Sequence, residues 1–239
     1  GVHADVLSGS ALRDLVIGSQ TAETIDGGAG DDDLFGRGGD DRIIGGDGGD
    51  AIDGGAGFDI VDFAGSNIGV RADLVTRLGQ GGHAQGDLYT AIEAFAGTEF
   101  HDELYGNGEA NLLSGRGGGD LLDGRGGDDS LDGGAGDDIL IGGTGADLLD
   151  GGEGSDTADY SASSAAVDVS LLAGTASGGD AEGDTLVSIE NLTGTLYDDR
   201  LEGDDADNTL SGGRGDDTLI GGLGNDILVG GRGADVMDG

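Results

Sequence analysis

Aliphatic residues recur at every ninth position over most of this chain, separated by segments of glycine and aspartate. Three consecutive segments that begin at Gly133, Gly142 and Gly151 read GGAGDDILI, GGTGADLLD and GGEGSDTAD. Laid out in full, this grid covers residues 9–62, 97–159 and 194–238 with six, seven and five repeats. A fixed short period is the sequence signature of a solenoid, in which each repeat packs against its neighbours.

Three positions of the nine-residue repeat are nearly invariant. Position 1 is always glycine, and position 8 is always apolar, from Val16 to Met237. Position 6 carries a carboxylate or an amide, with Glu23, Asn111 and Asn208 as the exceptions to aspartate. The position-6 aspartates are Asp14, Asp32, Asp41, Asp50, Asp59, Asp102, Asp120, Asp129, Asp138, Asp147, Asp156, Asp199, Asp217, Asp226 and Asp235. A disordered acidic tail would not keep this register.

Two 34-residue segments, 63–96 and 160–193, interrupt the grid and resemble each other at an offset of 97 residues. Val70 matches Val167, Asp87 matches Asp184, and Glu93 matches Glu190. Each insert also alternates apolar and polar residues as a strand does, for example over 167–171. We therefore expect the inserts to be wider coils of one continuous solenoid over 1–239. Independent loops are the alternative.

Composition narrows the possible partners. Carboxylates outnumber cations by 49 to 10, and the formal net charge of −39 argues against nucleic acid or an anionic membrane surface as a partner. With 57 glycines but no proline the chain is not collagen, and without cysteine it has no disulfides. No apolar run is long enough to span a membrane, and no signal peptide is visible. The chain begins and ends within the repeat pattern, which suggests a piece of a longer protein.

The glycine and aspartate loops suit a hard cation. Ca²⁺ takes six to eight oxygens from carboxylates and backbone carbonyls, and glycine allows a tight turn to aim its carbonyls inward. If nine residues form half a coil, loops 18 residues apart stack and share an ion, which gives twelve candidate sites with +24 charge and lowers the net charge to −15. Both loops have glycine at position 4 (consensus loops) in Asp32/Asp50, Asp41/Asp59, Asp120/Asp138, Asp129/Asp147, Asp138/Asp156 and Asp217/Asp235.

The other six sites use the first two repeats of a block, where position 4 is not glycine. We expect these sites to be weaker, or these repeats to be transition coils. Their position-4 residues are Leu12, Thr21, Phe100, Glu109, Tyr197 and Ala206.

The nonapeptide resembles that of the repeats-in-toxin (RTX) family, GGxGxDx-aliphatic-x, over 153 of the 239 residues. The resemblance implies an all-β parallel β-roll, a β-helix solenoid of nonapeptide half-coils that binds multiple Ca²⁺ ions. It also implies export of the unfolded chain by a type I secretion apparatus, and hence a secreted protein located extracellularly or at the cell surface.

Catalytic signals are weak. We find no Gly-x-Ser-x-Gly elbow, no His-Glu-x-x-His and no cysteine nucleophile, and His3, His83 and His101 are scattered. The acidic loop 180–184 is a candidate for an additional site, but its counterpart at 83–87 keeps only Asp87, so we interpret the loop as a solvated turn. The aligned aromatic pairs Phe63/Tyr160 and Phe100/Tyr197 are expected to pack at insert boundaries rather than to stack on a ligand.

These observations favour a calcium-binding structural module of a larger secreted protein that folds on binding Ca²⁺ after secretion. One aliphatic residue in nine is too little apolar burial to offset backbone ordering, so metal binding must supply the difference. The expected affinity is that of extracellular calcium modules, roughly 10⁻⁴–10⁻³ M. One alternative is an adhesin or surface filament that self-associates. Another is an accessory carbohydrate module, which would bind an anionic polysaccharide such as alginate through calcium or through Arg37, Arg116, Arg125, Arg214 and Arg232. An enzyme is the least favoured reading.

Overall fold

The computed structural model describes residues 5–239 and shows an all-β solenoid of short, mostly parallel strands. Two compact units divide the chain: residues 1–107 with 111–120, and residues 108–110 with 121–239. Each unit contains two sheets, and successive nonapeptides alternate between them. The helices within residues 5–239 are single 3₁₀ turns, η1 (Gly82–Ala84) and η2 (Gly179–Ala181), so none has the length or hydropathy to cross a bilayer.

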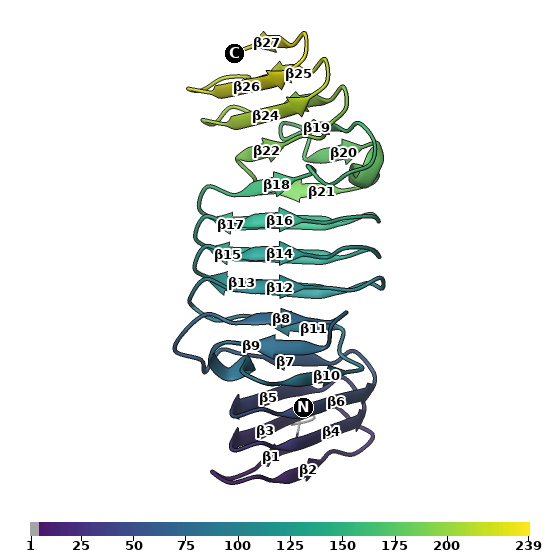
Figure 1. Cartoon of the computed structure of the whole chain (residues 1–239), viewed down its shortest axis with the longest axis vertical. Coiled ribbons are helices and arrows are strands. Elements are labelled where there is room, and N and C mark those ends of the chain that lie inside the picture. Colours follow the sequence, from purple (N-terminus) through teal and green to yellow (C-terminus); the bar gives the residue numbers. More distant parts are fainter. Residues whose placement is uncertain (1–4) are drawn as a thin grey trace. The chain divides into compact units, whose positions relative to one another are not determined.

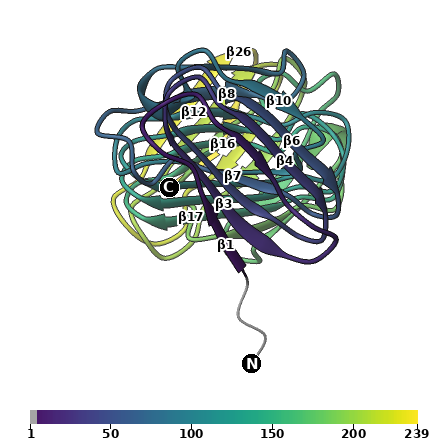
Figure 2. The ribbon, with the colours of Figure 1, turned by 90° about the horizontal axis from the view of Figure 1, so that it is seen from below.

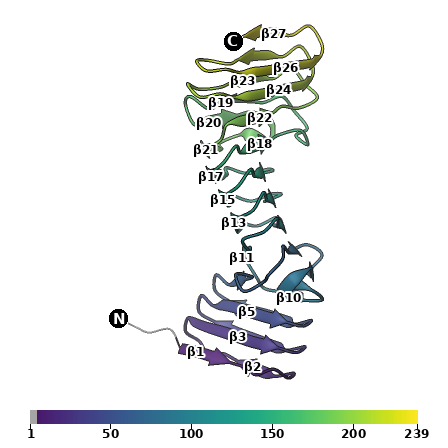
Figure 3. The ribbon, with the colours of Figure 1, turned by 90° about the vertical axis from the view of Figure 1, so that its left-hand side faces the viewer.

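In the first unit, the coils stack as neighbouring rungs, which is clearest for β1, β3 and β5 in Figure 3. One sheet has the order β1 (Asp5–Ser8), β3 (Glu23–Ala29), β5 (Arg42–Asp47), β7 (Ile60–Asp62), β11 (Ala94–Ala96), β13 (Leu112–Gly117). The other has the order β2 (Leu15–Ile17), β4 (Asp33–Gly38), β6 (Ala51–Ala56), β10 (Leu88–Thr90), β9 (Leu78–Gln80), β8 (Arg71–Asp73), β12 (Glu103–Tyr105). Figure 2 views the first coils end-on, with β3 and β4 on the two long sides of a flattened loop.

The second unit repeats this plan, with β14, β16 and β18 as successive rungs in Figure 1. One sheet has the order β15 (Ser130–Ala135), β17 (Leu148–Glu153), β21 (Thr185–Val187), β20 (Thr175–Ser177), β19 (Asp168–Ser170), β23 (Arg200–Glu202), β25 (Thr218–Ile220), β27 (Val236–Asp238). The other has the order β14 (Leu121–Asp123), β16 (Ile139–Ile141), β18 (Thr157–Asp159), β22 (Asn191–Thr193), β24 (Thr209–Arg214), β26 (Ile227–Arg232).

The strand register confirms the 18-residue coil. Leu34 lies opposite Ile52, and Leu131 lies opposite Leu149, so that each residue neighbours the equivalent residue two repeats away. The position-8 side chains point into the roll, and from Ile25 to Leu219 each of these residues is at most 2% exposed. The terminal coils are the exception, since Met237 is 53% exposed. The core is therefore a single line of aliphatic side chains along each sheet, as the period predicts.

Each insert remains within the sheets, but it is more than a wide coil. In the first insert, β8 pairs in parallel with the following coil and β10 with the preceding one, while β9 joins them with antiparallel pairing. The second insert builds the same three strands, β19 to β21, in the opposite sheet. The chain thus passes over two strand positions in the sheet and then doubles back to fill them. The sequence did not predict this antiparallel return.

Aromatic packing differs between the two predicted pairs. Phe63 and Tyr160 are 2% and 3% exposed at the insert junctions, and Phe63 packs with Tyr89 and Phe95 at ring-centroid distances of 6.4 and 5.9 Å. This pair therefore packs in the interior, as expected. Phe100 and Tyr197 are each 46% exposed, so the second pair does not fill the core.

Candidate metal sites

The position-6 side chains form a hydrogen-bonded ladder along each side of the roll. In each step, the backbone N–H of one position-6 residue donates to the carboxylate of the next coil, for example from Asp32 to Asp50 Oδ1 at 2.8 Å. The same hydrogen bond, between 2.8 and 3.1 Å long, runs from Asp14 to Asp32, Glu23 to Asp41, Asp41 to Asp59, Asp102 to Asp120, Asp129 to Asp147, Asp138 to Asp156, Asp199 to Asp217, Asn208 to Asp226 and Asp217 to Asp235. The structure therefore brings aspartates 18 residues apart together, as the period predicts.

The second carboxylate oxygen distinguishes the consensus loops. Within the described residues, the Oδ2 atoms of several position-6 aspartates are buried and have no hydrogen-bond partner: Asp32, Asp41, Asp50, Asp59, Asp147, Asp156 and Asp217. Each of these residues is at most 2% exposed. An unpartnered carboxylate oxygen in the interior is costly, so this arrangement calls for a bound cation or proton. In the terminal coils, Asp14, Asp226 and Asp235 are only half-buried.

A second oxygen points to the same place as Oδ2. A Cβ atom built on Gly27 would lie 2.6 Å from Asp32 Oδ2 and 2.6 Å from the carbonyl oxygen of Gly45 in the next coil. The same pair of atoms faces position 1 at Gly36, where Asp41 Oδ2 and the Gly54 carbonyl converge. Position 1 must therefore be glycine, because a side chain would fill this space. A carboxylate and a carbonyl from stacked loops are oxygen ligands that suit Ca²⁺.

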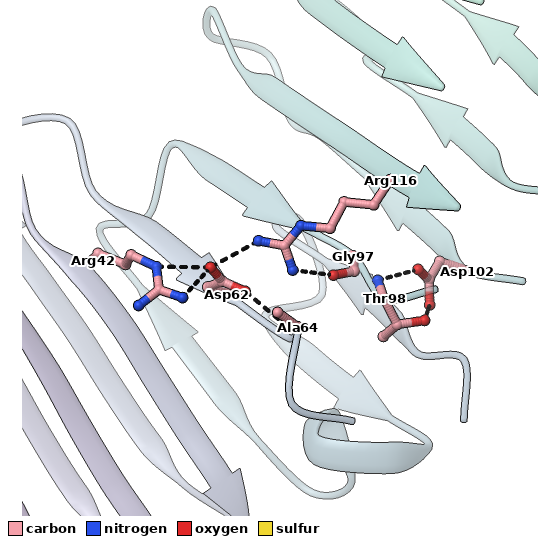
Figure 4. Close-up of polar contacts among 7 residues, drawn as sticks. All are labelled: Arg42, Asp62, Ala64, Gly97, Thr98, Asp102 and Arg116. Atoms are coloured by element: carbon pink, nitrogen blue, oxygen red, sulfur yellow. Dashed lines mark hydrogen bonds and ion pairs between the residues drawn. The ribbon is translucent and has the colours of Figure 1, made fainter. Parts of the chain in front are cut away.

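The loops of the first two repeats in each block are satisfied internally. Asp102 Oδ2 accepts the backbone N–H of Thr98 at 2.6 Å, and the Thr98 hydroxyl donates to Oδ1 at 3.1 Å (Figure 4). Ser10, Ser19 and Thr195 bond Asp14, Glu23 and Asp199 in the same way. Asn111 and Asn208 accept the N–H groups of residues 107 and 204. These oxygens already have hydrogen-bond partners. Weaker calcium binding at these loops, which the lack of glycine at position 4 suggested, remains a prediction.

The inserts contribute carboxylates that the repeat grid omits. Asp87 and Asp184 accept the backbone N–H of Asp50 and Asp147, each at 2.9 Å, and so continue the ladder. Their Oδ2 atoms accept hydrogen bonds from tyrosine hydroxyls, Asp87 from Tyr89 at 3.4 Å and Asp184 from Tyr160 at 3.0 Å. Asp184 is only 2% exposed, so the interpretation of 180–184 as a solvated turn is wrong for this residue. Aspartate occupies the same aligned position in both inserts, 97 residues apart, and this match was the sequence signal for their shared place in the ladder.

The position-5 aspartates are a further set that sequence reasoning missed. Their side chains bond the backbone of the following coil, for example Asp40 Oδ1 with the N–H of Phe58 at 2.9 Å. Asp31, Asp128, Asp137, Asp198, Asp207 and Asp216 do the same. Position 5 thus holds successive loops together from the outside, while position 6 faces inward. The recurrent aspartate pair at positions 5 and 6 was the available signal.

The electrostatics of the two kinds of loop differ. Burial raises the pKa of the Asp50, Asp59 and Asp156 carboxyls to about 6, and nearby carboxylates add to the effect. In the hydroxyl-capped loops, where a Ser or Thr hydroxyl bonds the position-6 carboxylate, the effect is the opposite. The hydrogen bond from Ser19 lowers the pKa of Glu23. The consensus loops therefore hold charge that is unfavourable unless a cation offsets it, because desolvation penalises the ionised form.

One buried carboxylate in the first unit has its own counter-charges. Asp62 is 4% exposed and lies between Arg42 and Arg116, whose guanidinium nitrogens approach it to 2.6 and 2.8 Å (Figure 4). Arg116 also donates to the carbonyl of Gly97 at 2.8 Å. Arg116, one of the arginines considered for an anionic polysaccharide, is thus engaged in holding the junction of the first insert.

No conventional side-chain cage accompanies these loops. Among residues 5–239, no three carboxylate, imidazole or thiol groups converge on one point, so a cation would take many of its oxygens from backbone carbonyls. His83 lies 3.5 Å from Asp47, and His101 bonds the Gly119 carbonyl, so neither belongs to such a cluster. His3 lies outside the described residues.

Comparison with protein families identifies the repeats. The model of the RTX calcium-binding nonapeptide repeat matches residues 1–34, 26–61, 96–131, 123–158, 189–219 and 212–239, which together make up well over half of the chain. The gaps between matches fall on the two inserts. A search of curated proteins finds no match. The stacked glycine–aspartate loops and this match agree, and the chain belongs to the family of RTX calcium-binding nonapeptide-repeat proteins.

Proposed function

We propose that this chain is a calcium-dependent folding module of a larger secreted protein, ordered only after export through a type I secretion apparatus. The observation that carries the proposal is the set of buried Oδ2 atoms in consensus loops, such as those of Asp32, Asp41 and Asp50, that have no hydrogen-bond partner among residues 5–239. The proposed role is structural, since the family matches identify the nonapeptide blocks as calcium-binding repeats.

The residues present fit calcium. In the site between stacked coils, Asp32 Oδ2 and the Gly45 carbonyl would be ligands, and the Asp50 carboxylate bonds the same loop from the next coil. A bound Ca²⁺ supplies two positive charges where burial has raised the pKa of the carboxyls. Folding and binding are therefore coupled, because the stacked loops that form each site do not exist in the unfolded chain.

Coupling of folding to calcium binding suits a protein that is exported unfolded. A chain with a net charge of −39 repels itself and stays extended where calcium is scarce, which suits passage through a secretion channel. At extracellular calcium of roughly 10⁻³ M, modules of this class are occupied. The chain would then fold outside the cell, because calcium binding would stabilise the solenoid.

Circular dichroism with two cations tests the proposal. In chelator the far-UV spectrum should be that of coil, and a Ca²⁺ titration should produce β structure with a midpoint in the range of roughly 10⁻⁴–10⁻³ M. Mg²⁺ at the same concentrations should fail, because it is smaller and dehydrates reluctantly. A β spectrum that persists in excess chelator would refute calcium-coupled folding.

A further inference from the structure

The inserts place a glutamate in the ladder where the next position-6 aspartate would stand. Glu93 Oε2 accepts the backbone N–H of Asp59 at 2.9 Å, and Glu190 Oε2 accepts that of Asp156 at 2.9 Å. These steps span 34 residues rather than 18, so the grid does not predict them. Each glutamate nevertheless takes the same acceptor role toward the coil below as Asp50 takes toward Asp32.

The loop below each glutamate has the unpartnered oxygen of a consensus site. Asp59 and Asp156 are 0% exposed, and within residues 5–239 their Oδ2 atoms have no hydrogen-bond partner. Each Oδ2 lies 2.6 Å from the place of a Cβ on the position-1 glycine of its repeat, Gly54 or Gly151. This is the position that Asp32 Oδ2 occupies beside Gly27.

The insert also supplies the converging carbonyl. The carbonyl oxygen of Ala91 faces the space beside Gly54, and that of Ser188 faces the space beside Gly151. Both residues have a left-handed backbone, with φ of 49° and 50°, although neither is glycine. Non-glycine residues adopt such angles at a cost and often at functional positions. Two copies of the insert have kept this conformation despite having different residues there.

We propose that each insert completes an additional calcium site with the last nonapeptide of the block before it. The first site consists of Asp59, the Ala91 carbonyl and Glu93, and the second of Asp156, the Ser188 carbonyl and Glu190. The inference rests on the proposed calcium binding of the consensus loops. It extends that binding into the inserts: Ala91, Glu93 and Ser188 lie outside the family matches, and Glu190 lies at the start of one.

The other edge of the same insert does not have this arrangement. Asp87 and Asp184 continue the ladder there, but tyrosine hydroxyls occupy their Oδ2 atoms. The three atoms nearest to a Cβ on Gly45 all belong to Asp50, and those nearest to a Cβ on Gly142 all belong to Asp147, with no carbonyl among them. An insert therefore extends the calcium row on one side of the roll only.

Native mass spectrometry of the whole chain at saturating Ca²⁺ tests the proposal by counting bound ions. Glu93→Gln keeps an acceptor for the Asp59 N–H but removes the charge, and it should lose one ion. Glu190→Gln should lose one ion, and the double variant should lose two. Asp87→Asn is the matched control on the other edge. Asparagine keeps an acceptor for the Asp50 N–H and changes only the group that faces Tyr89 at 3.4 Å, so its count should equal that of the wild type.

The consensus variant Asp32→Asn separates this inference from the proposed function. If Asp32→Asn loses an ion while both glutamine variants keep the wild-type count, the insert sites do not exist and the consensus sites stand. If the wild-type chain binds no calcium, the proposed function itself fails. Should a glutamine variant not fold by circular dichroism, anomalous scattering from calcium-bound wild-type crystals decides. A peak beside Asp59 Oδ2 and the Ala91 carbonyl supports the site, and its absence overturns it.

Discussion

Replacing Asp50 by asparagine should stabilise the metal-free fold, and calcium should cancel most of this gain. Asp50 is 1% exposed, its Oδ1 accepts the Asp32 N–H, and its Oδ2 has no hydrogen-bond partner within the described chain. Asparagine keeps an acceptor oxygen for the Asp32 N–H and removes the buried charge. The metal-free fold should therefore gain stability, while the calcium-bound fold should lose a ligand.

The magnitude follows from the pKa. Burial raises the pKa of Asp50 from 3.8 to about 6, and a shift of this size corresponds to about 3 kcal/mol of destabilisation at neutral pH. Because the folded state has the higher pKa, it binds protons more tightly, so the penalty is present above pH 6 and disappears as the pH falls to 4. In calcium at a hundred times the Kd, loss of one site removes about 2.7 kcal/mol, which nearly cancels this gain.

The assay compares folding in two conditions. In chelator at pH 7.5, trimethylamine N-oxide can drive the metal-free chain to fold, and Asp50→Asn should need less of this osmolyte than the wild type. In Ca²⁺ at a hundred times the Kd, urea should unfold the variant and the wild type at about the same concentration, because the lost binding cancels the gain. Asp205→Asn removes the same charge from an exposed loop and is the control. Destabilisation by Asp50→Asn in chelator, a gain that persists undiminished in Ca²⁺, or equal effects of the two variants would refute the reasoning.

Three further predictions concern protons, hydroxyls and position in the chain. In chelator, β structure measured by circular dichroism should increase as the pH falls from 8 to 4.5, because burial raises the pKa of Asp87 to about 8 and that of Asp184 to about 6. A β content that does not change with pH would contradict this prediction. Tyr160→Phe leaves Asp184 Oδ2 without its hydroxyl and should cost about 1–3 kcal/mol in urea unfolding, more than Tyr89→Phe, whose hydrogen bond is longer. Asp138→Ala, in an interior coil, should raise the calcium midpoint for folding more than Asp235→Ala, in the half-buried last coil; equal midpoints would contradict the sharing of ions between stacked loops.

The repeat predicted the parts of the fold that depend on spacing alone. A nine-residue period with an apolar position 8 fits a coil of two repeats, or 18 residues. The pairing of Leu34 with Ile52 and the hydrogen bond from Asp32 to Asp50 therefore followed from the repeat grid. The alternation in the inserts likewise predicted that they would join the sheets. These features are local and repeated, and each copy supports the others.

The remaining features depend on contacts that no spacing reveals. The antiparallel strand β9 consists of Leu78, Gly79 and Gln80, a segment too short to show its direction from pattern. The tyrosine that bonds the insert aspartate comes from different positions in the two inserts, at Tyr89 and Tyr160, so the aligned copies conceal the shared contact. The acidic composition of 180–184 suggested solvent exposure, but Asp184 is buried and accepts hydrogen bonds from residues far away in the sequence, Asp147 and Tyr160.

Anomalous diffraction from calcium-saturated crystals tests the central claim most directly. The account predicts two rows of calcium peaks, one on each side of the roll, with ions roughly 2.3–2.6 Å from the Oδ2 atoms of Asp32, Asp41 and Asp217. The hydroxyl-capped loops at Asp102 and Asp199 should show weaker peaks than the consensus loops. Empty consensus loops at high calcium, or ions gathered mainly in the inserts, would contradict the account.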